Sequence, residues 1–225
     1  MLEAVLFDLD GTLADTAPDL CGAANFLLME AGRPPADFHR LRPYVSQGVR
    51  GLLHAAFGLT PEDMDYAPLA ERFLARYAAH LCVESRLFDG VPALLTDIEQ
   101  RQMTWGIVTN KRMRFTDPLV AQLDLSPRTT CVVSGDTTSE AKPSARPVLH
   151  ACSLLGVDPA RTLFVGDDRR DIEAGRAAGC TTVAVRYGYL GDCGPIETWG
   201  ADLIIDHPEA LIAYLGTQAI PPTAR

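Results

Sequence analysis

Short apolar runs, separated by segments long enough to form a helix, constrain the fold of this chain more than any other feature of its sequence. The runs lie at residues 4–7, 105–108, 131–134, 162–165, 182–185 and 202–205. Helix-compatible segments lie at 91–101, 115–123, 146–155, 171–178 and 208–215. Nearly continuous apolar strands that alternate with helices indicate a parallel sheet covered on both faces. We therefore predict an α/β fold with a doubly wound parallel sheet and a Rossmann-like core, in which ligands bind beyond the carboxyl ends of the strands.

Residues 15–86 interrupt this alternation. They contain amphipathic helical stretches at 18–31, 45–57 and 68–83, but no convincing strand. Segments rich in glycine and proline, at 32–35 and 58–61, separate these stretches. We interpret 15–86 as a helical cap domain inserted after the first strand, and 1–14 together with 87–225 as the α/β catalytic core. The tail at 220–225 is expected to fray.

Composition excludes several classes of partner. The net charge is −9 and lysine and arginine form no cluster, which argues against nucleic acid and anionic membranes as partners. No apolar run approaches the ~18 residues of a membrane span, and no basic region typical of a signal peptide opens the chain. We therefore expect a cytoplasmic protein, either a monomer or a homodimer. The six cysteines show no CxxC spacing and the five histidines no HxxxH or HxH pairing, so reduced thiols and no zinc site are expected.

The first apolar run ends in two carboxylates, Asp8 and Asp10, and Gly11 follows at once. Alternate residues of a strand share a face, so the two side chains would lie side by side. Two like charges this close are unfavourable unless a shared proton or a bound cation compensates. A site that binds Mg²⁺ and attacks phosphorus requires such a pair. The alternatives are a simple turn and a calcium loop, but no Glu lies at the distance such a loop requires.

Further polar residues follow the later apolar runs, and a doubly wound sheet brings all of them to the edge that carries Asp8 and Asp10. They are Thr109, Asn110, Lys142, Asp167, Asp168 and Asp171. Each has an ordinary explanation when taken alone: a helix cap for threonine, a solvated position for lysine, and a helix N-terminus for the aspartates. Together, in this order and at strand ends, they favour a catalytic site.

These residues and the position of the inserted cap resemble the haloacid dehalogenase superfamily of aspartate-nucleophile phosphatases over the whole chain. Residues 8–13 resemble its first motif, Thr109 the second, Lys142 the third, and residues 166–168 with Asp171 the fourth. Residues 15–20 are similar to the phosphoglycolate phosphatase branch. Residues 166–208 resemble more closely the N-acetylmuramic acid 6-phosphate phosphatases, which serve peptidoglycan recycling.

The resemblance implies a phosphomonoester hydrolase that needs Mg²⁺ and forms an aspartyl-phosphate intermediate. Asp8 would be the nucleophile, and Asp10 would act first as general acid and then as general base. The implied metal ligands are Asp8, the backbone carbonyl of Asp10, and Asp167. The presence of Asp10 favours phosphatases over dehalogenases, and Leu20 stands where the related mutases usually have histidine. Asp168 replaces a serine that is frequent in phosphoglycolate phosphatases.

The resemblance also assigns the remaining polar residues. Thr109, with its neighbour Asn110, and Lys142 would bind the substrate phosphate and stabilise the charge that develops on its oxygens. Asp171 would orient metal-bound water or Lys142.

Specificity is expected to come from the cap, where Arg50 lies in a glycine-rich segment at 46–51. Its forked donors suit a carboxylate or a phosphate, although a solvated helix arginine is an equal alternative; Arg112 is a weaker candidate. The expected partner is a small phosphate ester. On the resemblance, our first choice is N-acetylmuramic acid 6-phosphate and our second is 2-phosphoglycolate. Both pair a phosphate with a carboxylate, so a cap arginine could serve either. A non-catalytic binding module of the same fold is the competing hypothesis.

Overall fold

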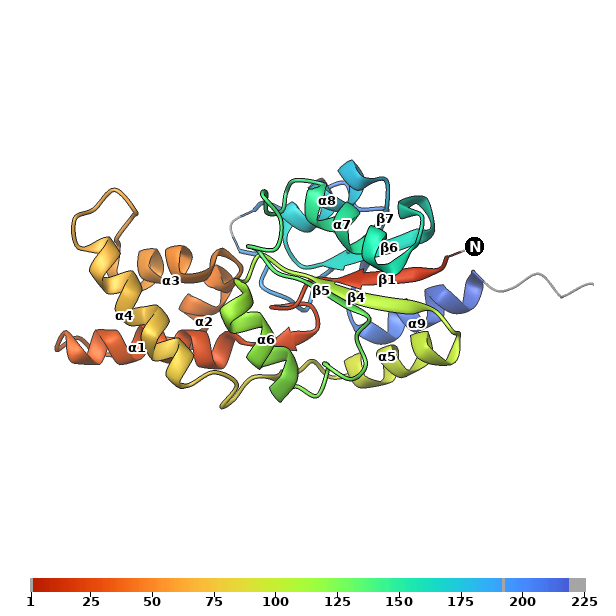
Figure 1. Cartoon of the computed structure of the whole chain (residues 1–225). Coiled ribbons are helices and arrows are strands. Elements are labelled where there is room, and N and C mark those ends of the chain that lie inside the picture. Colours follow the sequence, from red (N-terminus) through yellow and green to blue (C-terminus); the bar gives the residue numbers. More distant parts are fainter. Residues whose placement is uncertain (1, 192, 219–225) are drawn as a thin grey trace, which may run out of the picture.

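The main sheet of the protein has six parallel strands in the order β5-β4-β1-β6-β7-β8 (Figure 1). The computed structural model describes residues 2–191 and 193–218. Its sheet strands are β1 (Ala4–Phe7), β4 (Thr104–Val108), β5 (Cys131–Val133), β6 (Thr162–Gly166), β7 (Thr181–Val185) and β8 (Leu203–Ile205). β1 pairs with β4 on one side and with β6 on the other, so the strand order reverses around β1. This is the topological switch point at which doubly wound sheets bind ligands.

Helices cover both faces of the sheet. On one face, Val5 and Phe7 of β1 belong to a buried cluster that also takes in residues of three helices. These are α5 (Val91–Gln100), α6 (Met113–Gln122) and α9 (Pro208–Thr217). On the other face, Leu6 packs with α7 (Arg146–Leu155) and α8 (Arg169–Ala178). The alternation along β1 explains why its sequence is apolar throughout, and the predicted doubly wound α/β fold is confirmed.

A group of helices stands beyond the carboxyl end of β1, on the left of Figure 1. They are α1 (Ala17–Glu30), α2 (Phe38–Leu41), the 3-10 helix η1 (Arg42–Gln47), α3 (Gly48–Phe57) and α4 (Tyr66–Ala79). They enclose a buried apolar cluster that includes Leu27, Leu52 and Phe73, and Phe115 of α6 and Tyr189 join it. The assignment of 15–86 to a separate cap domain stays a prediction.

The structure differs from the expected cap in three places. The expectation of no strand within 15–86 is wrong at both edges, because β2 (Ala14–Asp15) and β3 (Arg86–Leu87) form a short antiparallel pair. Two residues are too few to produce a strand pattern in the sequence. The helix predicted at 45–57 begins only at Gly48, whose φ of +61° favours glycine and ends the preceding 3-10 turn. The helix predicted to reach residue 83 ends at Ala79, and the tail at 220–225 lies outside the described residues.

Two further findings concern the described residues as a whole. None of their helices is both long and apolar enough to cross a membrane. All six cysteines are free, and four of them are buried.

The packing of the cap helices predicts the cost of a truncation. Phe73 of α4 is fully buried, so Phe73→Ala removes a whole aromatic side chain and leaves a cavity. We expect the free energy of unfolding to fall by about 3–5 kcal/mol, measured by urea denaturation followed by circular dichroism. Met64→Ala, at a side chain that is 95% exposed, should change it by less than about 0.5 kcal/mol. Similar losses in the two variants would contradict this packing.

Candidate active site

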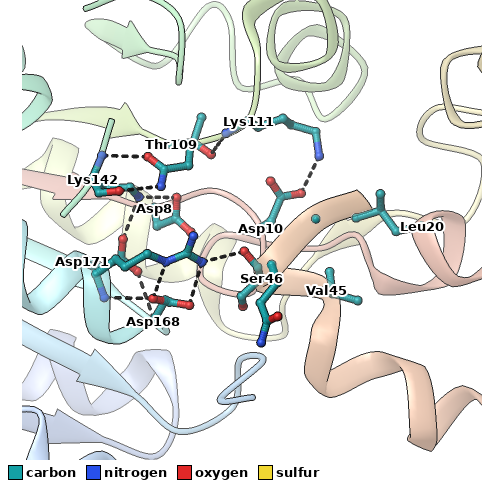
Figure 2. Close-up of a pocket in the computed structure, with 14 residues that line it drawn as sticks. Asp8, Asp10, Leu20, Val45, Ser46, Thr109, Lys111, Lys142, Asp168 and Asp171 are labelled. Atoms are coloured by element: carbon teal, nitrogen blue, oxygen red, sulfur yellow. Dashed lines mark hydrogen bonds and ion pairs between the residues drawn. The ribbon is translucent and has the colours of Figure 1, made fainter. Parts of the chain in front are cut away.

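A polar pocket of about 230 Å³ opens where the carboxyl end of β1 meets the cap helices. Its lining comes from both parts of the chain (Figure 2). The side chains from the sheet include Asp8, Asp10, Thr109 and Lys142, and the cap contributes Leu20 and residues 45–48. The structure therefore brings together the predicted residues that follow β1, β4 and β5.

Lys142 is held by two hydrogen bonds and a further ion pair at the centre of the site. Its ammonium group donates to Asp8 Oδ1 at 2.7 Å and to the carbonyl of Val108 at 2.7 Å. It also lies 2.7 Å from Asp171 Oδ1. These three partners come from the segment after β1, from β4 and from α8, and they fix the ammonium beside Asp8. The alternative of a solvated lysine is excluded, because this side chain is only 2% exposed.

Asn110 and Thr109 support this arrangement in different ways. The side-chain amide of Asn110 makes two 2.9 Å hydrogen bonds to the backbone of Lys142, one in each direction. The predicted substrate ligand Asn110 therefore holds Lys142 in place with its amide. The hydroxyl of Thr109 accepts a bond from the Lys111 N–H at 3.1 Å, and the helix that follows is capped by Arg112. Thr109 therefore does not cap this helix, and it lines the pocket.

Asp8 and Asp10 form ion pairs with different lysines, Asp8 with Lys142 and Asp10 with Lys111 (Figure 2). Asp10 Oδ1 accepts bonds from Lys111 Nζ at 2.8 Å and from Thr16 Oγ1 at 2.6 Å. Asp10 Oδ2 accepts no hydrogen bond from the described residues, and the same holds for Asp8 Oδ2. Each carboxylate therefore keeps one oxygen available to a ligand. Sequence reasoning missed Lys111, although it lies two residues after Thr109.

Three buried carboxylates, one of them that of Asp8, form a cluster at the site. One oxygen each of Asp8, Asp167 and Asp171 falls within 4.8 Å of the others. Asp167 is fully buried and accepts bonds from the Thr12 hydroxyl at 3.0 Å and the Tyr189 N–H at 2.7 Å. The carboxylate of Asp10 is not part of the cluster. The role of its backbone carbonyl as a metal ligand stays a prediction.

The backbone is shaped to fit this cluster. A Cβ atom on Gly11 or on Gly188 would overlap Asp167, and one on Gly166 would overlap Asp171. Glycine at these positions lets the chain approach the carboxylates closely. Substitution by a larger residue would displace the acidic groups.

The three carboxylates of the cluster carry more negative charge than the ammonium group of Lys142 can balance. Burial raises the pKa of Asp167 well above its usual value, and the neighbouring Asp8 and Asp171 add to the effect. Burial raises the pKa of Asp171 to about 7, with Lys142 opposing this shift and Asp8 adding to it. Burial by itself would lower the pKa of Lys142, but Asp171 and Asp8 raise it, so this lysine stays charged. One ammonium cannot balance three carboxylates, and their hard oxygen donors fit a divalent cation such as Mg²⁺.

Asp168 and Arg170 form a second charged pair at the pocket wall. Asp168 caps α8, and its carboxylate accepts bonds from Arg170 Nε at 2.8 Å and Nη2 at 2.9 Å. Asp171 completes a capping box by accepting the Asp168 N–H at 3.0 Å. Arg170 was not predicted as a site residue either, because its pairing with Asp168 depends on side-chain directions that a motif does not specify.

The structure does not bring the predicted cap arginine into the pocket. Arg50 is exposed in the first turn of α3 and does not line the cavity. Arg112 is likewise exposed and outside it. The cap residues that line the pocket are Leu20 and residues 45–48. Among them, the hydroxyl of Ser46 donates to the carbonyl of Tyr189 at 2.9 Å.

Comparison with known proteins links this geometry to a family. A family model described as haloacid dehalogenase-like hydrolase matches residues 5–185. The chain is 48% identical over 214 residues to N-acetylmuramic acid 6-phosphate phosphatase of Pseudomonas aeruginosa, with 95% of each chain covered. It is 44% identical over 209 residues to phosphoglycolate phosphatase of Xanthomonas campestris, covering 92% of this chain and 94% of that one. A crystal structure described as a predicted phosphoglycolate phosphatase of Haemophilus somnus has a TM-score of 0.82 at 28% identity, covering 95% of this chain and 98% of that chain.

The raised pKa of Asp171 predicts a pH dependence of stability in metal-free buffer. Between about pH 4 and about pH 7 the folded protein binds more protons at Asp171 than the unfolded chain does. The free energy of unfolding should therefore fall as the pH rises through this window, by an amount on the order of a few kcal/mol. Asp171→Asn should make this slope shallower, as measured by urea denaturation at a series of pH values.

Asp124→Asn provides the matched control. Asp124 is exposed and has a positive φ of 56°, which asparagine tolerates. In Asp124→Asn, the free energy of unfolding should fall with pH as steeply as it does in the wild type. A wild-type slope in Asp171→Asn would contradict the assignment of the pH dependence to this carboxyl.

Proposed function

The chain belongs to the haloacid dehalogenase-like hydrolase family and is a phosphatase, and we propose that Asp8 is the nucleophile with which it cleaves a small phosphate monoester. One observation carries this proposal. Asp8 lies at the pocket with Oδ1 bound to Lys142, while its Oδ2 accepts no hydrogen bond from the described residues. A carboxylate that lines a ligand cavity and is held through one oxygen can attack with the other.

Two displacements at phosphorus would complete the reaction. In the first, Asp8 forms a bond to phosphorus, the bond to the ester oxygen breaks, and Asp10 gives that oxygen a proton. In the second, Asp10 takes a proton from water, the water oxygen attacks phosphorus, and the bond to Asp8 breaks. The available Oδ2 of Asp10 suits both proton transfers, and Lys111 with Thr16 fixes the carboxylate through its other oxygen.

The remaining residues would offset the repulsion between the anionic phosphate and the carboxylates of the site. We propose Mg²⁺ as the cation for Asp8 and Asp167, with the backbone carbonyl of Asp10 as a further ligand. When bound, the ion supplies positive charge that lets the anionic nucleophile and the anionic phosphate approach each other. Lys142 and the hydroxyl of Thr109 would bind the transferring oxygens. Asp171 would hold Lys142 in position.

For the substrate we propose N-acetylmuramic acid 6-phosphate, which places the enzyme in peptidoglycan recycling. Relatives with this activity in their names, from Pseudomonas aeruginosa and Pseudomonas putida, are 48% and 45% identical over nearly the whole chain. The second candidate is 2-phosphoglycolate, because the Xanthomonas campestris relative at 44% identity is named a phosphoglycolate phosphatase.

Substitution of the proposed nucleophile gives a direct test. The amide of Asp8→Asn is a much poorer nucleophile than a carboxylate, so turnover should fall by at least about 10³-fold. Steady-state phosphate release and circular dichroism would separate lost chemistry from lost structure. Asp124→Asn should keep wild-type turnover. Substantial activity in a folded Asp8→Asn variant would exclude Asp8 as the nucleophile.

The choice of substrate predicts a kinetic preference. We expect kcat/KM for N-acetylmuramic acid 6-phosphate to exceed that for 2-phosphoglycolate by about tenfold or more, measured side by side with Mg²⁺ present. A reversed preference would make the enzyme a phosphoglycolate phosphatase. No hydrolysis of any phosphomonoester, including a generic aryl phosphate, would instead favour the non-catalytic binding module.

A further inference from the structure

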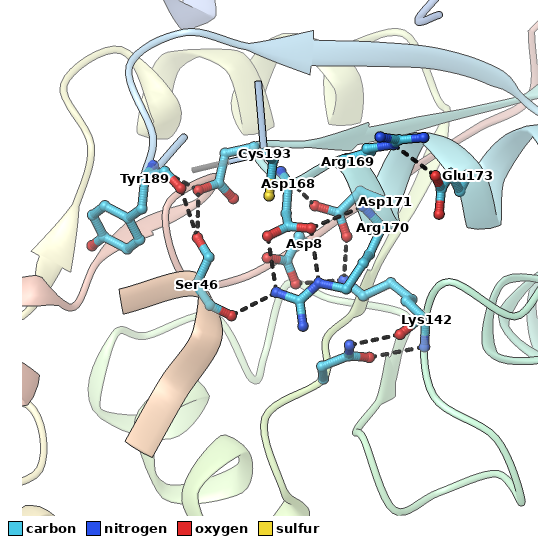
Figure 3. Close-up of polar contacts among 12 residues, drawn as sticks. Asp8, Ser46, Lys142, Asp168, Arg169, Arg170, Asp171, Glu173, Tyr189 and Cys193 are labelled. Atoms are coloured by element: carbon cyan, nitrogen blue, oxygen red, sulfur yellow. Dashed lines mark hydrogen bonds and ion pairs between the residues drawn. The ribbon is translucent and has the colours of Figure 1, made fainter. Parts of the chain in front are cut away.

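Three cationic side chains line the pocket, and two of them are engaged at the reacting groups. Lys142 bridges Asp8 and Asp171, and Lys111 pairs with Asp10. Arg170 is the third. It stands at the boundary between core and cap, where its Nη2 donates to the backbone carbonyl of Ser46 at 2.7 Å (Figure 3).

The guanidinium of Arg170 is held rigidly but keeps donors free. Asp168 is buried and binds Nε at 2.8 Å and Nη2 at 2.9 Å, which fixes the plane of the group. Nη1 makes no hydrogen bond to the described residues, so its two N–H groups are available. The side chain is 35% exposed, which leaves it accessible from the pocket. An arginine oriented in advance loses little conformational freedom when it binds an anion.

We propose that Arg170 is a specificity residue that binds a second anionic group of the substrate, a carboxylate, while the phosphate lies against Asp8. This inference rests on the proposed phosphatase function and names the chemical class that the enzyme selects. The Nε–H and both N–H groups of Nη2 already bind Asp168 and Ser46, so the two N–H groups of Nη1 are the donors left for carboxylate oxygens. Arg170 fulfils the role that the sequence suggested for Arg50, but from the first turn of α8 and not from the cap.

Two sugar phosphates, one with and one without the carboxylate, test this role. N-acetylglucosamine 6-phosphate has a hydroxyl in place of the lactyl ether that carries the carboxylate of N-acetylmuramic acid 6-phosphate, and the two are otherwise identical. In Arg170→Gln, the ratio of the two kcat/KM values should fall by at least about tenfold, and most of the loss should appear in KM of the carboxylated sugar. Arg169→Gln is the matched control, since Arg169 is exposed in the same helix turn and pairs with Glu173 (Figure 3). Its ratio should equal that of the wild type.

The possible outcomes separate specificity from structure. Equal losses for both sugars in Arg170→Gln would overturn the inference, because Arg170 would then only hold residue 46 in place. If Arg170→Gln does not fold, Arg170→Lys keeps the charge but removes the Nη1 donors, and an unchanged ratio there would overturn the inference as well.

The activity of the wild type shows whether a negative result contradicts this inference or the proposed function. If it hydrolyses only 2-phosphoglycolate, the same variants are compared on that ester and on 2-hydroxyethyl phosphate, which lacks the carboxylate; the ratio should again fall in Arg170→Gln alone. A wild type inactive on every phosphomonoester would overturn the proposed function itself. An active wild type whose ratio Arg170→Gln leaves unchanged would overturn only the role of Arg170.

Discussion

The ammonium group of Lys142 joins the three parts of the core that meet at the switch point of the sheet. It bonds to Asp8 after β1, to the Val108 carbonyl of β4, and to Asp171 of α8. Loss of one partner from a buried ion pair typically costs about 3–5 kcal/mol, because the other charge is left uncompensated. Lys142 thus stabilises a site that would otherwise concentrate carboxylates without compensation. The parallel strand order makes this possible by bringing the carboxyl ends of β1, β4 and β6 together.

The two aspartates of the first motif acquire different properties from their neighbours. Asp8 faces Lys142 and belongs to the acidic cluster, whereas Asp10 faces Lys111 and Thr16 outside it. A nucleophile must approach an anionic phosphate, which requires nearby positive charge. A proton carrier must reach the leaving oxygen and does not need the same cation. The separate lysines therefore give a physical basis for the division of labour that we propose.

The strands and the residues at their carboxyl ends could be predicted because both signals are strong. Buried parallel strands leave continuous apolar runs, and the topology brings Asp8, Thr109 and Lys142 to one edge whatever the details of packing. Pairings such as Lys111 with Asp10 depend on side-chain directions and on the docked cap, which periodicity does not encode. Arg50 does not line the pocket, and helical periodicity does not indicate which cap residues reach a cavity between two parts of the chain. The pair formed by β2 and β3 was missed because strands of two residues leave no pattern.

We propose that Asp8 and Asp167, beside Asp171, hold a divalent cation that balances the buried negative charge of this cluster. A calorimetric titration of the wild type and of Asp167→Asn with Mg²⁺, in the absence of substrate, tests it most directly. We predict that the wild type binds one ion per chain and that Asp167→Asn weakens this binding by at least about tenfold. Asp124→Asn should bind as the wild type does. No Mg²⁺ binding to the wild type, or equal affinity in Asp167→Asn, would contradict the account.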